Sequence, residues 1–347
     1  MGAPADNGRS LCCDVHVSKS DPLSIAAKVL HEPQVATGGF SGETFAGTWF
    51  REPAFVRLYL RKPSQAVLDL AVMRRLSGQV PLPKILAAEP RGVGGLPPHI
   101  VTREVEGKRA DQLLDRGLPL PASNALGRQC ARLVTRLREV RAEGHGPWAD
   151  ADLRTSQWPP SQADLIAWYE HLEAGLAAAG LGRRSTPGLR AAVAAAAQRL
   201  AMGPPRPASL VHGDLNGKNL IVDPNTGRLR GVLDWEFSHG GEWTEDVGNL
   251  LRAADHGAGS GEVGAASWSA FRRGLVDALH TGIYEDGTVS TATLGGLDDD
   301  WLQRAADLDV FALLELSARP ERGAAAPAPV VVARTALRSL AAVRGRR

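Results

Sequence analysis

The sequence has few of the features that mark secreted and membrane proteins. Only three cysteines occur among its 347 residues (Cys12, Cys13 and Cys130), too few for a disulfide framework, and no C-x-x-C pair is present. No run of about 18 apolar residues could span a membrane. No charged segment followed by an apolar one opens the chain, as a signal peptide would. We therefore expect a cytoplasmic protein with no membrane partner.

A strong excess of charge is also lacking. The formal net charge is +2 and charged residues make up 22% of the chain. Because no concentrated basic patch is present, no nucleic-acid partner is expected. A chain of this length can bury a large core and is expected to form two lobes or domains. The composition does not distinguish a monomer from a dimer.

The chain does contain one dense cluster of chemically useful residues. His212-Gly213-Asp214-Leu215-Asn216-Gly217-Lys218-Asn219 is followed by Asp234-Trp235-Glu236. The stretch between them has two apolar runs, 220–222 and 229–233, separated by the turn formers of 223–227, which predicts a β-hairpin. The order H-x-D-L-x-x-x-N, hairpin and Asp-led tripeptide is the layout of a kinase catalytic core.

The predicted hairpin places two side chains near each other. With its turn near Gly227, Asn219 falls roughly opposite Asp234, and opposed residues have Cβ atoms about 4.5–5.5 Å apart. Mg²⁺ prefers such oxygen ligands and usually takes one or two carboxylates together with phosphates. Asp214, five residues before Asn219, could accept the proton of an attacking hydroxyl. The alternative is an ordinary hairpin with a surface Asp and Asn.

The pattern of elements predicts an α+β chain with two lobes. Strands are expected near 35–37, 45–50, 55–60 and 99–102, with helices at 21–30 and 63–78. From Ser123, a predicted helix N-cap, helical patterns dominate: a helix after Ser123, one capped by Ser161, one opening at Thr186-Pro187, then 246–255, 263–281, 299–317 and a basic C-terminal helix. The expected division is a tail and short helix (1–33), a small β-rich lobe (34–107) and a larger, mainly helical lobe (108–347).

The small lobe carries candidate nucleotide-binding residues. Gly39, Ser41, Gly42 and Thr44 belong to a glycine-rich turn between two predicted strands, where backbone N–H groups could approach phosphates. A purely structural turn would look the same. Arg57, on the next strand, could hold phosphates. Asp69, on the next helix, could orient that cation, although a surface Arg and a solvated Asp are the alternatives.

Together these motifs resemble those of the aminoglycoside phosphotransferase and choline kinase-like group, relatives of the protein kinases. The resemblance covers nearly the whole chain from Val35 to Leu316 and implies a two-lobed protein-kinase-like fold. By motif, Asp214 resembles the catalytic base and Asn219 and Asp234 resemble Mg²⁺ ligands. Arg57 matches the phosphate-binding cation of these enzymes, with ATP or GTP as donor.

The resemblance also implies a nucleotide hinge and an ion pair in the small lobe. Thr102, Glu104 and Val105 match the hinge whose backbone binds the base. Asp69 matches the acid paired with Arg57, and it is one methylene shorter than the usual Glu.

The acceptor is expected to be a small molecule. Only twelve residues separate Asp234 from Asp246, and no A-P-E follows, whereas a protein kinase needs a longer activation segment. An antibiotic phosphotransferase is the main hypothesis, for an aminoglycoside or another sugar- or nucleoside-containing antibiotic. A metabolic kinase of choline, homoserine or a sugar and a non-catalytic nucleotide-binding regulator are the alternatives.

Residues 255–315 are expected to form the acceptor wall. Eleven acidic residues, Asp298 among them, oppose three arginines there, which would favour a cationic acceptor. A solvated acidic helix face is the alternative. Trp243, Trp268 and Trp301 could stack on an acceptor ring, although a tryptophan at such a position is more often part of the core. Glu236 could extend the metal site, orient the acceptor or make a salt bridge at the strand end.

Overall fold

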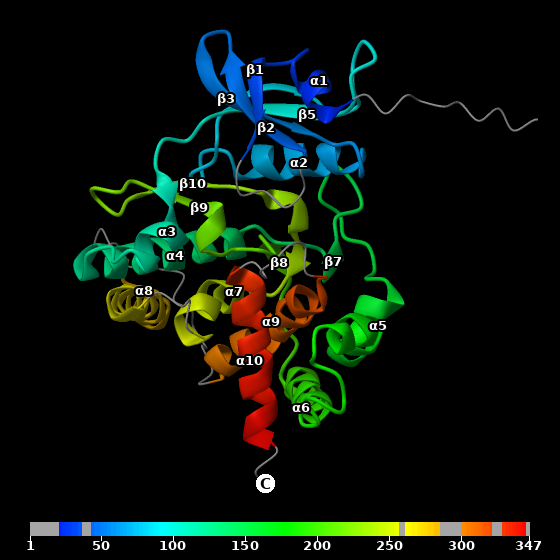
Figure 1. Cartoon of the computed structure of the whole chain (residues 1–347), viewed down its shortest axis with the longest axis vertical. Helices are drawn as coiled ribbons and strands as arrows, with labels where there is room; N and C mark the ends of the chain where they lie inside the picture. The colour runs from blue at the N-terminus through cyan, green and yellow to red at the C-terminus, as the bar shows by residue number, and fades with distance from the viewer. Residues whose placement is uncertain (1–20, 37–42, 257–260, 285–299, 321–327, 345–347) are drawn as a thin grey trace, which may run out of the picture.

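A computed structural model describes residues 21–36, 43–256, 261–284, 300–320 and 328–344. A small antiparallel sheet with helix α2 along its lower edge lies above a larger helical part (Figure 1). The sheet order is β1-β2-β3-β5-β4. Its elements are α1 (Pro22–Ala26), β1 (His31–Val35), β2 (Thr44–Trp49), β3 (Glu52–Leu58), α2 (Gln65–Leu76), β4 (Ile85–Glu89) and β5 (His99–Arg103). The predicted α+β fold class is confirmed.

Strand β3 positions one of the candidate site residues. Ala54, Val56 and Leu58 are buried in the core of the small lobe together with Ala26 of α1. Because side chains alternate between the two faces of a strand, Arg57 projects from the opposite face. Thr44 is the residue directly opposite Arg57 on β2.

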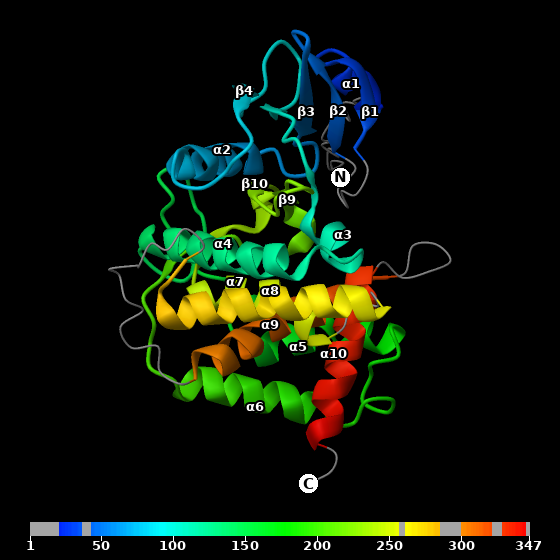
Figure 2. The ribbon, with the colours of Figure 1, turned by 90° about the vertical axis from the view of Figure 1, so that its left-hand side faces the viewer.

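The larger part is built from helices and short strands. Helices α4 and α8 lie side by side across it (Figure 2). Its elements are β6 (Lys108–Arg109), α3 (Ala110–Asp115), α4 (Leu120–Glu139), β7 (Gly146–Pro147), α5 (Leu165–Ala178), α6 (Leu189–Met202), β8 (Ser209–Val211), β9 (Leu220–Val222), β10 (Leu229–Val232), β11 (His239–Gly241), α7 (Trp243–His256), α8 (Gly261–Thr281), α9 (Trp301–Ala318) and α10 (Ala328–Arg344). Three short 3₁₀ turns cover Pro160–Gln162, Gly217–Asn219 and Trp235–Phe237.

Two glycines allow α4 and α8 to pack closely. A Cβ atom on Gly127 would lie 2.1 Å from the Phe271 carbonyl oxygen, and one on Gly274 would lie 2.0 Å from that of Asn124. One face of α4 is apolar, and its residues Leu126, Cys130, Leu133 and Leu137 belong to the main core. This packing supports the layer beneath the catalytic hairpin.

Both predicted serine caps are wrong. Helix α4 begins at Leu120, so Ser123 lies inside it, and its hydroxyl donates to the Leu118 carbonyl at 2.9 Å. Helix α5 is capped by Asp164, whose carboxylate accepts the N–H groups of Ile166 and Ala167. Aspartate competes well with serine for this role, and the pattern at 161–164 contained both residues.

Two features concern the ends of the small lobe. The predicted first helix ends at Ala26 and is followed by β1, which the sequence placed later, near 35–37. β6 pairs with β9 of the catalytic hairpin, just after Gly107. The boundaries at 33 and 107 remain predictions.

None of the helices in the described ranges is long and apolar enough to cross a membrane.

Candidate active site

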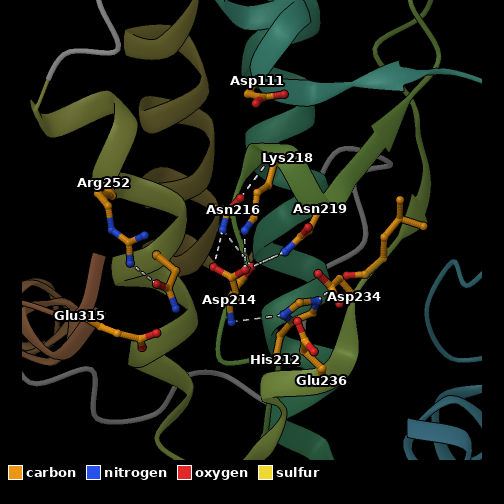
Figure 3. Close-up of polar contacts among 12 residues, drawn as sticks. Asp111, His212, Asp214, Asn216, Lys218, Asn219, Asp234, Glu236, Arg252 and Glu315 are labelled. Carbon is orange, nitrogen blue, oxygen red and sulfur yellow. Dashed lines mark hydrogen bonds and ion pairs between the residues drawn. The ribbon is translucent and has the colours of Figure 1, made fainter. Parts of the chain in front are cut away.

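The segment after β8 gathers polar groups around Asp214. Figure 3 shows Asn216, Lys218 and Asn219 pointing toward its carboxylate. Oδ1 accepts the Asn216 amide at 2.7 Å, and Oδ2 accepts the Asn219 amide at 3.1 Å. Lys218 Nζ lies 2.8 Å from Oδ2, and only 17% of this lysine side chain is exposed. Lys218 therefore faces the candidate base.

A buried carboxyl group fixes the backbone of this loop. Asp246 accepts the N–H of His212 at 2.8 Å and that of Gly213 at 3.0 Å. Burial raises its pKa to about 7, against the opposing effect of these two hydrogen bonds. Gly213 has φ +76°, and a Cβ there would lie 2.4 Å from the Phe237 carbonyl oxygen. Asp246 thus ties helix α7 to a turn that requires glycine.

His212 supports the loop from the other side. Its Nε2 lies 2.9 Å from the Leu233 carbonyl oxygen, and its Nδ1 lies 3.3 Å from the N–H of Asp214. Burial lowers its pKa, so the ring is neutral at pH 7, donates from Nε2 and accepts at Nδ1. Its role is to position the loop.

The predicted hairpin forms, with a register shifted by about one residue. The Leu233 N–H donates to the Asn219 carbonyl at 2.9 Å, so Asn219 faces Leu233, and Asp234 follows it. The shift arises at the turn, where the Asp223 N–H donates to the Arg228 carbonyl at 2.9 Å, and a bulge between Leu229 and Gly231 makes up one residue of it. Asp234 has φ 62° and ψ 69°, a left-handed conformation that a non-glycine residue rarely adopts. Such outliers cluster at functional sites.

Arg57 crosses from the small lobe to bind the Asp-led tripeptide. Its Nη1 lies 2.5 Å from Asp234 Oδ1, and its Nη2 binds the Glu236 carboxylate. Burial lowers the Arg57 pKa, but the two carboxylates outweigh this and raise it. Burial raises the Glu236 pKa, partly offset by Arg57. Glu236 therefore makes the salt bridge that the sequence left as one of its three possible roles.

The expected ion pair between Arg57 and Asp69 is not formed. Asp69 instead accepts the Tyr59 hydroxyl at 2.7 Å and the Gln65 amide at 2.8 Å. Burial raises its pKa, and the charge of nearby Arg57 opposes this. The short aspartate side chain is held by these local donors, while Arg57 reaches the larger lobe.

The structure describes only some of the other residues that were predicted to bind the nucleotide. Gly39, Ser41 and Gly42 lie outside the described residues. Thr102 lies within β5, paired with both β3 and β4. The Glu104 N–H donates to the Pro53 carbonyl at 2.9 Å, which leaves Val105 as the hinge position not engaged by the sheet.

The proposed metal ligands fit a site completed by phosphates. The Asn219 Nδ2 group donates to the carbonyl and the carboxylate of Asp214, so the amide oxygen is the atom left for a cation. Within the described ranges, no group of three or more His, Cys, Asp or Glu side chains could hold a metal. One carboxylate and one amide match a Mg²⁺ that takes its remaining ligands from phosphates and water.

The expected aromatic contacts with an acceptor are wrong. Trp243, Trp268 and Trp301 are each only 4–5% exposed and belong to the main core. The rings of Trp243 and Trp301 pack 6.0 Å apart, and Trp268 donates to Asp115 at 2.8 Å. No face of these rings is left for stacking on an acceptor.

Four acidic residues of the expected acceptor wall are paired with arginines. Asp307 binds Arg199, Asp309 binds Arg252, and Asp255 and Glu315 bind Arg272 and Arg319. Three of these arginines lie outside residues 255–315, so a count of charge within that window missed them. Asp298 lies outside the described residues. These ion pairs lower the negative charge of the described part of this wall, which weakens the expectation of a cationic acceptor.

A model of the APH phosphotransferase enzyme family matches residues 33–285. Because this match covers well over half of the chain, the protein belongs to that family. It is a small-molecule phosphotransferase, as the motif at 212–219 and the short segment before Asp246 indicated. The search of curated proteins found no match.

Solved structures show the same fold at low sequence identity. A candidate aminoglycoside phosphotransferase from Ralstonia eutropha JMP134 is 19% identical, with 92% of this chain and 94% of that chain covered and a TM-score of 0.54. The GDP and kanamycin complex of APH(2″)-IIIa is 17% identical, with 83% and 85% covered and a TM-score of 0.54. A thermostable mutant of APH(4)-Ia with AMP-PNP and hygromycin B is 15% identical, with 84% and 97% covered and a TM-score of 0.50.

Three residues near Asp214 were not predicted as part of the site. Asn216 both binds Asp214 and caps the 3₁₀ turn by accepting the Lys218 N–H at 3.1 Å. Its position before a glycine was a turn signal that could have identified it. Arg252 binds Asn249 and Asp309 within the core. Asp246 was noticed only as part of a motif, because its backbone contacts have no sequence signature.

Proposed function

We propose that this protein transfers the γ-phosphate of ATP or GTP to a hydroxyl group of a small-molecule antibiotic. The observation that carries the proposal is the arrangement around Asp214, where Asn216, Lys218 and Asn219 surround one carboxylate. In this proposal Asp214 accepts the proton of the acceptor hydroxyl. Its three donors fix the carboxylate so that an oxygen faces that proton.

Asn219 and Asp234 are the proposed ligands of Mg²⁺. These two residues would hold the ion, which would supply positive charge to offset that of the transferring phosphate. Asp234 is currently bound to Arg57. We propose that nucleotide binding gives Arg57 phosphate oxygens in place of the carboxylates of Asp234 and Glu236, which releases Asp234 for the cation. Arginine suits this exchange because its planar fork binds carboxylate and phosphate alike.

The nucleotide is proposed to lie between the glycine-rich turn and the hinge. Thr44 and Arg57, opposite each other on β2 and β3, would bind phosphates together with Gly39, Ser41 and Gly42. Val105, and with it Glu104, would contact the base. GDP and AMP-PNP in the two similar complexes support either ATP or GTP as the donor.

An antibiotic acceptor is supported by the kanamycin and hygromycin B found in those complexes. The paired acidic residues weaken the argument for a polycationic aminoglycoside in particular. A test panel should therefore include neutral and nucleoside-containing antibiotics as well as aminoglycosides. Choline, homoserine and simple sugars belong in the same panel as the metabolic alternative.

The experiment is expression of the protein in a susceptible host, next to the variant Asp214→Asn. We expect the wild type to raise the inhibitory concentration of at least one antibiotic in the panel and the variant to leave it unchanged. The purified protein should then phosphorylate the same compound. Unchanged susceptibility to every compound, with turnover of a metabolite, would replace the antibiotic proposal by a metabolic kinase.

A further inference from the structure

A cavity lies between the two lobes, and none of the residues that line it belongs to the group around Asp214. Its volume is about 580 Å³, within the range of about 300–1,000 Å³ that is usual for small-molecule sites. On one side it is lined by α2 and by the turn after β4. On the other it is lined by the segment 140–153 that follows α4. Figure 2 shows α2 above α4 at this junction.

Four arginines border this cavity. Arg74 and Arg75 come from α2, Arg91 from the turn after β4, and Arg141 from the larger lobe, while Asp152 is the single acidic residue in the lining. None of the four guanidinium groups has a hydrogen bond or an ion pair with any residue that the structure describes. This differs from Arg272 and Arg304 of the wall at 255–315, which are paired with carboxylates.

The positive charge extends behind the cavity. Burial lowers the pKa of Arg138, and the charges of Arg141 and Arg206 lower it further. A local excess of positive charge of this kind attracts anions. Arginines that converge on one space also offer the paired donors that bind phosphate and carboxylate groups.

The floor of the cavity is apolar. Val67, Leu70 and Ala71 line it from α2, and Val140, Trp148 and Leu153 line it from the larger lobe. A bare inorganic ion would leave these surfaces in contact with water. A ligand with an apolar ring would cover them, and about 25 cal/mol is gained for each Å² of apolar surface that is removed from water.

We propose that this cavity binds a small organic anion, in which a phosphate or carboxylate group on an apolar ring contacts the arginines while the ring covers the apolar floor. Such a ligand would touch both lobes. At 100° per residue, Val67, Ala71 and Arg74 lie on the side of α2 opposite Gln65 and Asp69, which face the catalytic cleft. The binding site is thus distinct from the phosphotransfer site and does not depend on which acceptor is used.

The test uses the full chain with its nucleotide cleft already filled by Mg²⁺ and a non-hydrolysable nucleotide. 1-Naphthyl phosphate is titrated calorimetrically, with 1-naphthoate, 1-naphthol and inorganic phosphate as separate arms. We expect one site for each naphthyl anion, weaker binding at higher salt, and much weaker binding of 1-naphthol and of inorganic phosphate. The two naphthyl anions show whether phosphate or carboxylate is preferred.

The decisive variant removes one arginine from each side of the cavity, Arg74→Gln with Arg141→Gln. We expect its dissociation constant for 1-naphthyl phosphate to rise at least about tenfold, because each charge-assisted hydrogen bond contributes about that factor. The matched control, Arg183→Gln with Arg190→Gln, removes two exposed arginines that bind Glu173 and Glu170. It should bind as the wild type does.

Three outcomes would overturn the proposal. They are absence of binding to the wild type, equal weakening in both double variants, and inorganic phosphate binding as tightly as the naphthyl anions. All four substituted arginines are exposed, so both variants should fold. Thermal unfolding curves that match the wild type would verify this. A failure here would leave phosphotransfer unaffected, since the assay measures binding at a separate site.

Discussion

Replacement of Asp214 by asparagine tests the proposed base with little change of shape. The carboxylate accepts donors from Asn216 and Asn219 and pairs with Lys218. An amide in its place cannot take the acceptor's proton, and its NH₂ group would face one of those donors. General base catalysis contributes about 10²–10⁴ in rate, which corresponds to about 3–5 kcal/mol in the activation barrier.

The assay is steady-state phosphotransfer with separate variation of nucleotide and acceptor. We expect kcat to fall by about 10²–10⁴ while the KM for nucleotide is unchanged, because Asp214 is not a proposed phosphate or base contact. Asn216→Ala serves as a graded comparison. It removes one hydrogen bond from the same carboxylate and should lower kcat by about tenfold or less. A wild-type kcat in Asp214→Asn would refute the assignment of the base.

Three further predictions follow from the contacts around the site. Lys218→Met should lower kcat by about 10–100-fold in the same assay, since it removes a charged partner of the base. Lys218→Arg, which keeps the charge, should retain part of the wild-type kcat. An unchanged kcat in Lys218→Met would exclude a role for this lysine. Asp309→Asn should reduce the free energy of unfolding by about 3–5 kcal/mol, because it leaves Arg252 buried without its partner. Asp307→Asn should reduce it less, because its partner Arg199 is 39% exposed. Equal losses of the two variants in denaturant melts would contradict this reasoning. The Asp246 pKa is raised from 3.8 to about 7. Between these two pH values the folded state holds a proton on this carboxyl that the unfolded state has lost. The stability that protonated Asp246 contributes is therefore complete below pH 3.8 and is lost as the pH rises through 7. The denaturation midpoint of the wild type should therefore fall more steeply from about pH 5 to pH 8 than that of Asp246→Asn, and parallel profiles would show that this carboxyl does not titrate there.

Local patterns predicted the catalytic hairpin well. Turn formers at 223–227 and apolar runs on either side determine a hairpin largely by themselves, so the nearness of Asn219 and Asp234 followed from the sequence. The register was off by about one residue because the run of turn formers does not specify where the turn closes. The structure closes it between Asp223 and Arg228, and the bulge at Leu229–Gly231 makes up only part of the difference. The helices of the larger lobe were predicted for the same reason as the hairpin, because the periodic spacing of apolar residues is a property of the local sequence.

Contacts between distant segments could not be predicted in this way. The partners of Arg57 lie 177 and 179 residues away, and nothing in the sequence favours them over Asp69, the nearby acid. The negative charge of residues 255–315 was overestimated because three of their partners, Arg199, Arg252 and Arg319, lie outside that window. The tryptophans were misjudged because the same side chain serves a core or a binding surface, and only burial distinguishes the two.

The most direct test of the central claim is transfer of a labelled γ-phosphate by the purified protein. Labelled ATP and GTP are incubated separately with Mg²⁺ and the acceptor panel, and products are separated by mass. We predict that a small molecule gains one phosphate in a reaction that requires Asp214 and Mg²⁺. Nucleotide binding without transfer to any small molecule, or transfer only to protein, would contradict the proposed function.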